Sequence, residues 1–143
     1  MPRRPVRDFL ARDTLLKAEP EETVRDAAIG MAAHHCGSVL IARGDALVGI
    51  FTERDLLSRV VAAGRDLDTP LIEVMTANPD TIAADAPIKD AIRQMNECGY
   101  RHLPVIENDR VLGILSIRDL PFAEIALMEK ELDDRQSLAE RIW

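Results

Sequence analysis

Apolar residues near the start of the chain are spaced as in a helix followed by a pair of strands. Over residues 22–33 they recur every three or four positions, which predicts a helix with one apolar face. Two short apolar runs follow at residues 38–42 and 46–51, and the sequence Arg43-Gly44-Asp45 between them is typical of a turn. Thr52 then begins another helix. The predicted order is helix, strand, turn, strand, helix.

The same pattern returns 64 residues later. Gly49-Ile50-Phe51-Thr52-Glu53-Arg54-Asp55 corresponds to Gly113-Ile114-Leu115-Ser116-Ile117-Arg118-Asp119, and the same offset pairs Asp26-Ala27 with Asp90-Ala91 without a gap. A chance motif would not keep this register over most of the chain, so the sequence contains one unit twice. We expect the first copy, with the N-terminal segment, in residues 1–64 and the second in residues 65–121.

The second copy predicts the same elements as the first. They are, in order, a short strand (residues 81–83), a helix (87–97), two strands (103–107 and 110–115) around an Asn108-Asp109 turn, and a helix from Ser116. Pro87 suits the first position of its helix. In the first copy, residues 15–18 are the counterpart of the short leading strand.

Each copy places a hydroxyl and a carboxylate where its last strand meets the following helix. Thr52 and Ser116 are candidate N-caps, and helix N-termini bind phosphate through their exposed backbone amides. Asp55 and Asp119 lie three residues further on, about one helical turn along the same face. A carboxylate in this place suits the hydroxyls of a ribose. The alternative is a capping box, in which the acid bonds back to the cap amide.

With these residues the chain resembles a tandem pair of cystathionine-β-synthase (CBS) domains, often called a Bateman module. The hallmark is the pattern Gly-hydrophobic-x-Thr/Ser-x-x-Asp at residues 49–55 and again at 113–119, whose glycine allows close backbone approach. Arg101-His102-Leu103-Pro104-Val105 looks like the family's basic-basic-Leu-Pro-Val strand. The resemblance covers residues 6–121 and implies an α/β (α+β) fold. Each half would offer a short sheet and two helices, with the sheets packed face to face around two clefts.

The resemblance also implies a ligand, because the clefts of this family usually bind adenosine nucleotides. Asp55 and Asp119 would hold ribose hydroxyls, while Thr52 and Ser116 would contact phosphate or ribose. The other candidate positions lie beside the first strands, at the strand entrances and next to Asp119: Lys17, Ala18, Thr81 and Ile82; Ser38, Val39, Arg101, His102 and Pro104; and Arg118. The expected ligand is AMP, ADP or ATP, ahead of S-adenosylmethionine and NAD(H), and no metal is required.

The two copies differ in charge at one strand entrance. The second copy has Arg101-His102 where the first has Gly37-Ser38. A basic pair favours a phosphorylated ligand, so we expect one cleft to bind more strongly than the other. The sequence favours the cleft lined by Ser116 and Asp119.

Composition and charge fit a small soluble regulator. A chain of 143 residues is long enough for one domain, and a net charge of −7 argues against nucleic acid or an anionic membrane as a general partner. The Pro2-Arg3-Arg4-Pro5 start lacks the apolar core of a signal peptide, and no apolar run approaches the roughly 20 residues needed to span a bilayer. We therefore expect a cytoplasmic protein.

Catalytic and metal-binding patterns are weak. Cys36 and Cys98 are not in a paired metal-binding spacing. His34-His35-Cys36 and Cys98-Gly99 are better interpreted as helix ends, where a histidine can contact the last carbonyls and a glycine can form the C-cap. The sequence shows no nucleophile with an orienting partner, no acid and base pair in one predicted cleft, and no Walker-type loop. We do not expect an enzyme.

Residues 122–143 break the repeat. Their apolar residues alternate with charged ones at helical spacing and end in the chain's single tryptophan, Trp143, which predicts a helical tail that docks on something. Packing onto its own domain and docking onto a second subunit both remain open. Bateman modules commonly pair into disc-like dimers through their helices, so the resemblance predicts a homodimer.

These observations favour a sensor of adenosine nucleotides. Ligand binding would shift the halves or the subunits relative to one another, and an unidentified partner protein would respond to that shift. The alternative is a structural or dimerisation module whose clefts stay empty.

Overall fold

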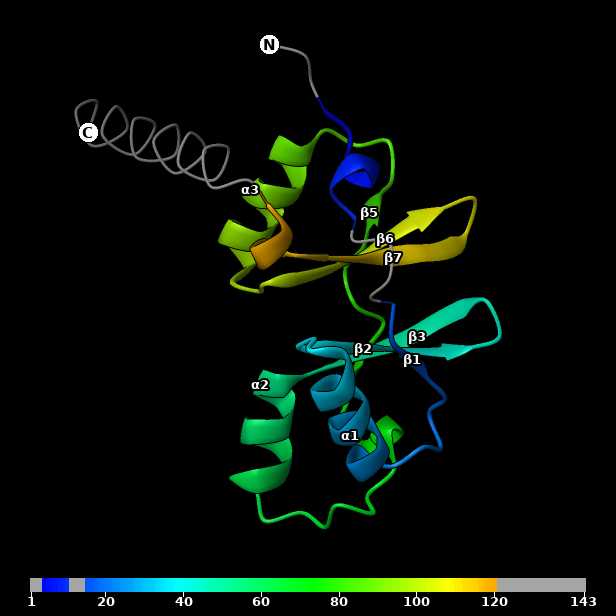
Figure 1. The fold of residues 1–143 in the computed structure, drawn as a ribbon, viewed down its shortest axis with the longest axis vertical. Helices are drawn as coiled ribbons and strands as arrows, with labels where there is room; N and C mark the ends of the chain where they lie inside the picture. The colour runs from blue at the N-terminus through cyan, green and yellow to red at the C-terminus, as the bar shows by residue number, and fades with distance from the viewer. Residues whose placement is uncertain (1–3, 11–14, 121–143) are drawn as a thin grey trace, which may run out of the picture.

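The structure, a computed structural model, describes residues 4–10 and 15–120. It consists of two similar halves stacked on one another, with helices at the far ends and a small sheet from each half at the centre (Figure 1). Strands of the two sheets, β3 (Ala46–Thr52) and β7 (Arg110–Ser116), contact each other across the centre. The predicted α+β fold with face-to-face sheets is confirmed. The predicted tail at residues 122–143 lies outside the described residues.

The first half is a four-stranded sheet with two helical segments. Its strands follow the order β1-β2-β3-β4, in which β1 runs parallel to β2 and the other neighbours are antiparallel. The helix predicted from Thr52 begins as α2 and continues without a break as a π-helix. Its elements are β1 (Lys17–Ala18), α1 (Val24–His34), β2 (Ser38–Arg43), β3, α2 (Glu53–Asp55), the π-helix Leu56–Val61, the 3₁₀ turn Leu71–Glu73 and β4 (Thr76–Ala77).

The second half repeats this arrangement with three strands in the order β5-β6-β7. The helix predicted from Ser116 is described only for its first turn, which is a 3₁₀ segment. The elements are the 3₁₀ turn Val6–Phe9, β5 (Ile82–Ala83), α3 (Ile88–Cys98), β6 (His102–Glu107), β7 and the 3₁₀ turn Ile117–Asp119. Among residues 4–10 and 15–120, no helix is both long and apolar enough to cross a bilayer.

Local sequence signals explain where the two long helices begin and end. Thr23 Oγ1 accepts a hydrogen bond of 3.2 Å from the Asp26 amide at the start of α1, and Pro87 holds the corresponding N-cap position of α3. Each helix ends on a left-handed residue, His35 (φ 52°) in α1 and Gly99 (φ 78°) in α3. The His34 ring lies 3.0 Å from the Gly30 carbonyl. The interpretation of both segments as helix ends is confirmed.

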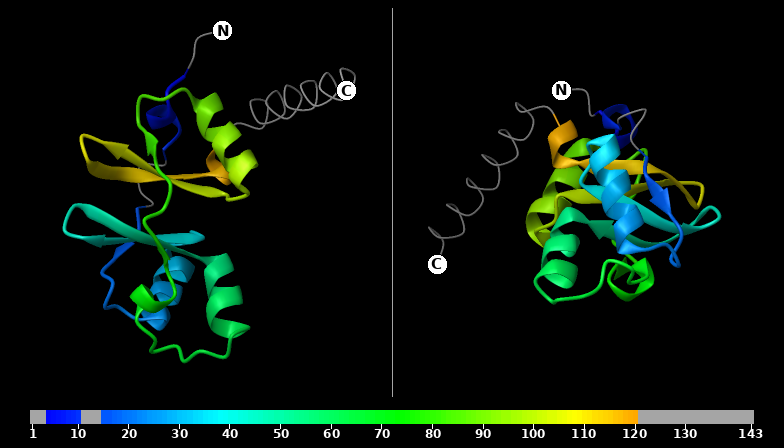
Figure 2. Two further views of the ribbon diagram at one scale, coloured as in Figure 1. Left: turned by 180° about the vertical axis from the view of Figure 1, so that it is seen from behind. Right: turned by 60° about the horizontal axis from the view of Figure 1, so that its bottom comes forward.

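Each core includes a segment that the division at residue 64 would assign to the other half. Leu71 and Val74 pack in the core of the first half, whereas Val6 and Phe9 pack in the core of the second half. Leu71 and Val74 continue the first half along the chain up to β4, whereas the first half separates the turn Val6–Phe9 from the second half. Figure 2 shows the N-terminal segment beside the second half. Burial of apolar surface explains this packing, because each sheet and its helices leave an apolar surface that the segment covers.

Candidate functional site

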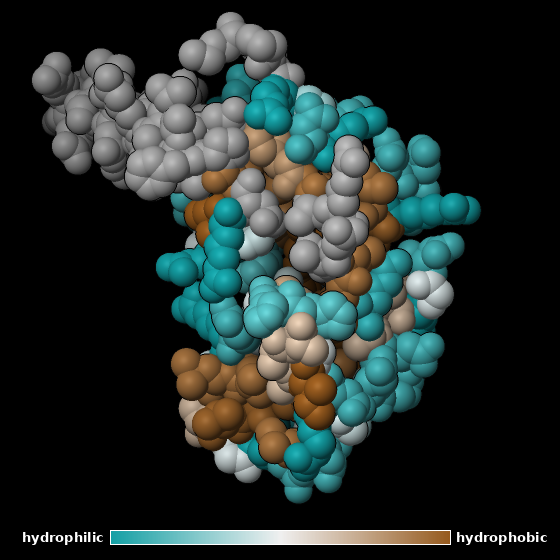
Figure 3. Space-filling model, in the orientation of Figure 1, coloured by the Kyte–Doolittle hydropathy of each residue, from teal (hydrophilic) through white to brown (hydrophobic). Residues whose placement is uncertain are grey.

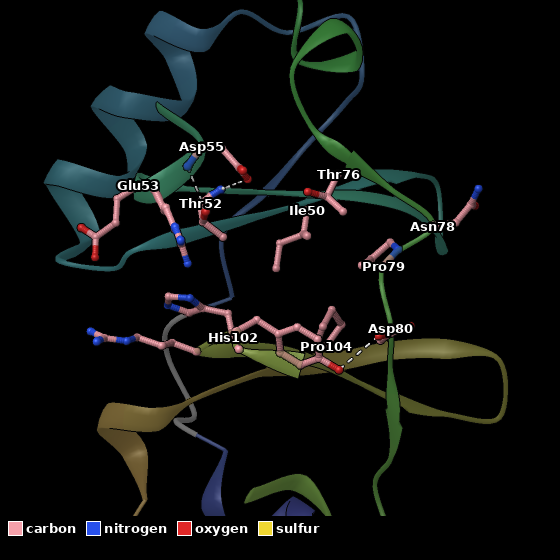
Figure 4. Close-up of a pocket in the computed structure, with 14 residues that line it drawn as sticks. Ile50, Thr52, Glu53, Asp55, Thr76, Asn78, Pro79, Asp80, His102 and Pro104 are labelled. Atoms are coloured by element: carbon pink, nitrogen blue, oxygen red, sulfur yellow. Dashed lines mark hydrogen bonds between the residues drawn. The ribbon is translucent and has the colours of Figure 1, made fainter. Parts of the chain in front are cut away.

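A cleft of about 720 Å³ lies between the two halves. It opens where the strand-to-helix junction of the first half faces the start of β6 in the second half (Figure 4). Its residues come from β3, α2, β4, the connection after β4, the connection between α3 and β6, and the start of β6: Ile50, Thr52, Glu53, Arg54, Asp55, Thr76, Asn78, Pro79, Asp80, Gly99, Tyr100, Arg101, His102 and Pro104. The cleft therefore exists only when the two sheets are packed together.

Thr52 and Asp55 form a capping box at the upper wall of this cleft. The Asp55 amide donates to Thr52 Oγ1 at 3.2 Å, and the Thr52 amide donates to Asp55 Oδ2 at 3.0 Å. Asp55 Oδ1 also lies 3.6 Å from Arg59 Nε. The capping interpretation of the first copy is thus confirmed. A carboxylate has about four acceptor sites, so these contacts leave Asp55 acceptor capacity for a ligand hydroxyl.

Basic groups from both halves gather near this capping box. Arg54 comes from α2, His102 begins β6, and Arg101 directly precedes that strand. His102 is half-buried and Arg101 is exposed. The N-terminus of the helix that begins at Glu53 adds a partial positive charge. One end of the cleft therefore combines a helix N-terminus, two arginines and a histidine, and such groups suit phosphate.

The opposite end of the cleft is acidic and polar. Tyr100 donates its phenol hydrogen to Asp80 Oδ2 at 3.2 Å and accepts a hydrogen bond of 2.9 Å from Gln94 Nε2. Burial, together with the nearby Asp80 carboxylate, raises the pKa of Tyr100 to about 12. Between the two ends lie Ile50 and the buried Pro104, which give the cleft an apolar middle.

The sequence predicted Thr52, Asp55, Arg101, His102 and Pro104 as site residues, and the structure brings these five together. The other predicted positions whose side chains the structure describes do not line this cleft. Val39 and Ile82 are 1% and 8% exposed and belong to the two cores. Lys17 and Ala18 form β1 at the edge of the first sheet, and Thr81 precedes β5.

Ser38 pairs with Thr52 across β2 and β3, as His102 pairs with Ser116 across β6 and β7. Ser38 is buried, with 4% of its surface exposed, whereas Ser116 accepts a bond of 3.4 Å from the Arg118 amide. The backbone of Asp119 ends the 3₁₀ turn after β7, and its side chain lies outside the described part of the structure. The predicted ribose role of Asp119 stays a prediction.

A second, smaller cleft of about 400 Å³ lies beside the first. Arg118 lines it, together with His35, Cys36 and apolar residues of α1. Glu53 lines both clefts, and its Oε1 lies 3.5 Å from Arg118 Nη2. Within the described residues, no group of three or more His, Cys, Asp or Glu side chains is placed to hold a metal ion.

Sequence reasoning missed the acidic end of the larger cleft. Thr76, Asn78 and Asp80 follow no periodic pattern, and β4 is only two residues long. Tyr100 directly precedes the basic pair, and its position next to Arg101 was the one available signal.

Comparison with known proteins agrees with the repeat. The CBS domain family model matches residues 6–62 and 71–123. The Arabidopsis thaliana protein "CBS domain-containing protein CBSCBSPB2" is 38% identical over 127 residues, which is 85% of this chain. The chain spans only 24% of that relative's length.

Solved structures show the same fold. The Pyrobaculum aerophilum CBS domain protein PAE2072, which was solved in complex with AMP, superposes with a TM-score of 0.78 at 29% identity, covering 86% of this chain and 98% of that one. The CBS domain pair of protein MJ0100, in complex with 5′-methylthioadenosine and S-adenosyl-L-methionine, gives 0.73 at 25% identity, covering 81% of this chain and 95% of that one. Because the family model covers both repeats and the fold agrees over most of the chain, the chain belongs to the CBS domain family and contains two CBS domains in tandem.

Proposed function

We propose that this protein is a non-enzymatic regulatory module that binds an adenosine nucleotide in the larger cleft. The observation that carries the proposal is the meeting of two halves there: the Thr52 and Asp55 junction of the first faces Arg101 and His102 of the second. The AMP bound to PAE2072 and the adenosine derivatives bound to MJ0100 support the ligand class. AMP, ADP and ATP rank ahead of S-adenosylmethionine and NAD(H), because the basic end suits phosphate.

The polarity of the cleft suggests how the ligand lies. Its phosphates would face Arg54, Arg101 and His102, and its ribose hydroxyls would donate to Asp55, which keeps acceptor capacity beyond the capping bond. The base would then occupy the apolar middle, between Ile50 and Pro104. The sequence favoured the cleft of Ser116 and Asp119 because of the basic pair Arg101-His102. This pair lies across from Thr52, so the geometry favours the cleft at Thr52.

Ligand binding at this place would act on the arrangement of the two halves. A nucleotide that contacts both halves stabilises the spacing at which both sets of contacts form, and any difference in affinity between two arrangements shifts their populations. We propose that a partner protein in the cytoplasm responds to this shift.

A homodimer is the second element of the proposal, and an exposed apolar surface supports it. Leu57 and Val61 lie four residues apart on one face of the π-helix and are 65% and 62% exposed, and Ile29 on α1 is 61% exposed. Figure 3 shows an apolar area over this helical side of the first half. Exposed apolar patches commonly mark protein interfaces. The same surface would also serve a dimerisation module with empty clefts, which is the competing function.

Thermal unfolding with and without ligand distinguishes the two functions. A nucleotide present at about a hundredfold excess over its Kd adds about 2.7 kcal/mol to the free energy of unfolding. At this chain length each kcal/mol raises the midpoint by about 2–8 °C. We expect a clear rise with at least one of AMP, ADP, ATP, S-adenosylmethionine and NADH, each at roughly millimolar concentration. A flat response to all five from ligand-free protein would favour the dimerisation module.

A charge variant then tests the cleft itself. Arg101→Gln should weaken AMP binding by about tenfold or more, because one charge-assisted hydrogen bond is worth about 1.5–3 kcal/mol. Arg110→Gln is the matched control, since Arg110 is an exposed arginine at the start of β7 that does not line the cleft. Equal AMP affinities for the two variants would remove Arg101 from the site.

A further inference from the structure

Glu53 occupies an unusual place for a carboxylate, at the basic end of the larger cleft. It directly follows Thr52, lines both clefts and lies 3.5 Å from Arg118 of the other half. A Cβ atom at Gly37 would lie 2.9 Å from Glu53 Oε1 and 3.4 Å from His102 Nε2, so the carboxylate and the imidazole both approach the same backbone position. A negative charge therefore stands among the cations that would bind phosphate.

The local fold does not require an acid at this position. The capping box uses Asp55, and the Glu53 backbone amide already donates to the Gly37 carbonyl at 2.9 Å. The second copy has Ile117 at the corresponding position, followed by the same Arg-Asp pair. The ion pair with Arg118 is exposed on both sides, and such pairs contribute little stability. The charge of Glu53 thus has its main effect on whatever enters the cleft.

We infer that Glu53 is an internal counter-ion that sets how much phosphate charge the cleft accepts. It partly neutralises the cluster of Arg54, Arg101, His102 and Arg118, and it repels each negative charge that a ligand adds. The cleft would consequently discriminate against ligands with more phosphates while leaving the nucleoside part unaffected. This inference rests on the proposed nucleotide-binding function and names the residue that determines its selectivity.

The expected effect can be expressed as a change in affinity. We consider two unit charges about 6 Å apart and an effective permittivity between about half that of water and that of water. Their interaction then changes the binding affinity about three- to tenfold. Glu53→Gln should therefore tighten AMP binding by about that factor and ATP binding by more. Adenosine binding should stay the same. Added salt should reduce the gain, because ions screen charges near the surface.

Calorimetric titration of the full chain with adenosine, AMP and ATP tests this inference. Glu73→Gln is the matched control, because Glu73 is also an exposed carboxylate, 3.8 Å from Arg65, and lines neither cleft. We expect the ratio of AMP affinity to adenosine affinity to rise in Glu53→Gln, to stay at the parental value in Glu73→Gln and to return towards it in Glu53→Asp.

The outcomes separate the inference from the function on which it rests. If the parent and Glu53→Gln bind AMP with the same affinity, or if Glu53→Gln binds AMP more weakly, the counter-ion role is refuted and nucleotide binding stands. An equal gain for adenosine and AMP would also refute it, since a structural change and not charge would then explain the gain. If the parent binds none of the three ligands, the proposed function and this inference fail together.

Discussion

Replacing Gly49 by alanine should destabilise the protein, whereas the same change at Gly113 should not. The two glycines occupy corresponding positions in the repeat, and both are buried in the middle of a strand. Neither has a positive φ, so alanine is compatible with the backbone at both. Any difference in stability must come from the surroundings.

Those surroundings differ in the structure. A Cβ atom at Gly49 would overlap with Met75 Sδ and lie 3.1 Å from the Thr76 carbonyl oxygen of β4. At Gly113 the nearest atoms would be the methyl carbons of Leu10, at 3.4 Å, which is ordinary contact. The Met75 side chain must therefore move in the first variant, and β4 must shift slightly because its backbone cannot turn away.

Overpacking of this kind lowers the free energy of unfolding by about 1–3 kcal/mol. The reduced backbone freedom of the unfolded chain raises it by about 0.4–1 kcal/mol. We expect Gly49→Ala to lower the free energy of unfolding by about 1.3 kcal/mol, the difference between the midpoints of these two ranges, and by about 2.6 kcal/mol at most. Gly113→Ala should leave it unchanged or raise it by up to about 1 kcal/mol. Urea denaturation followed by circular dichroism measures both values.

A third variant tests the cause. If the clash with Met75 is responsible, the double variant Gly49→Ala/Met75→Ala should lose less stability than the sum of its single changes, because the two sites are coupled. The reasoning is refuted if Gly113→Ala is as destabilising as Gly49→Ala. It is also refuted if the two changes in the double variant are additive.

Three further predictions concern the core, the cap and the cleft. Leu71→Ala should lower the free energy of unfolding by about 2–5 kcal/mol in urea titrations, because Leu71 is fully buried in the core of the first half; a loss below about 1 kcal/mol would contradict that packing. Thr52→Ala should cost about 0.5–2 kcal/mol in the same assay through loss of the cap, and an unchanged midpoint would show that the capping box contributes nothing. Tyr100 is the only tyrosine, so ultraviolet absorbance should show a single phenol titrating near pH 12, and Tyr100→Phe should abolish the signal. The folded protein holds this proton more tightly than the unfolded chain, so the contribution of Tyr100 to the free energy of unfolding is complete below about pH 10 and is lost as the pH rises towards 12. A phenol that titrates near pH 10 would contradict the burial of Tyr100.

Local signals in the sequence accounted for most of the secondary structure. Periodic apolar residues predicted α1 and α3 to within two residues at each end. The turn at Asn108-Asp109 follows from residues that tolerate positive φ, with values of 51° and 61°. These features depend on interactions within a few residues, so one sequence is enough to predict them. The capping box at Thr52 belongs to the same class.

Part of the site was also predictable, but its assembly was not. The hydroxyl, the carboxylate and the basic pair were each recognisable from the repeat. The alternation of side chains along a strand does not predict which face of the strand packs on a helix and which faces the other sheet. Val39 and Ile82 were therefore expected at the site although they belong to the cores. The acidic end with Asp80 and Tyr100 comes from irregular segments that have no periodic signal.

The sequence by itself determined that one α+β unit occurs twice, where its helices and turns lie, and which residues could contact a nucleotide. Only the tertiary structure decided that Arg101 and His102 face Thr52, that Leu71 packs in the core of the first half, and that Val6 completes the core of the second half, from which it is remote in sequence. The physical reason is the range of the interactions. Hydrogen bonds within a helix or turn are local, whereas the burial that brings distant segments together depends on the whole packed surface.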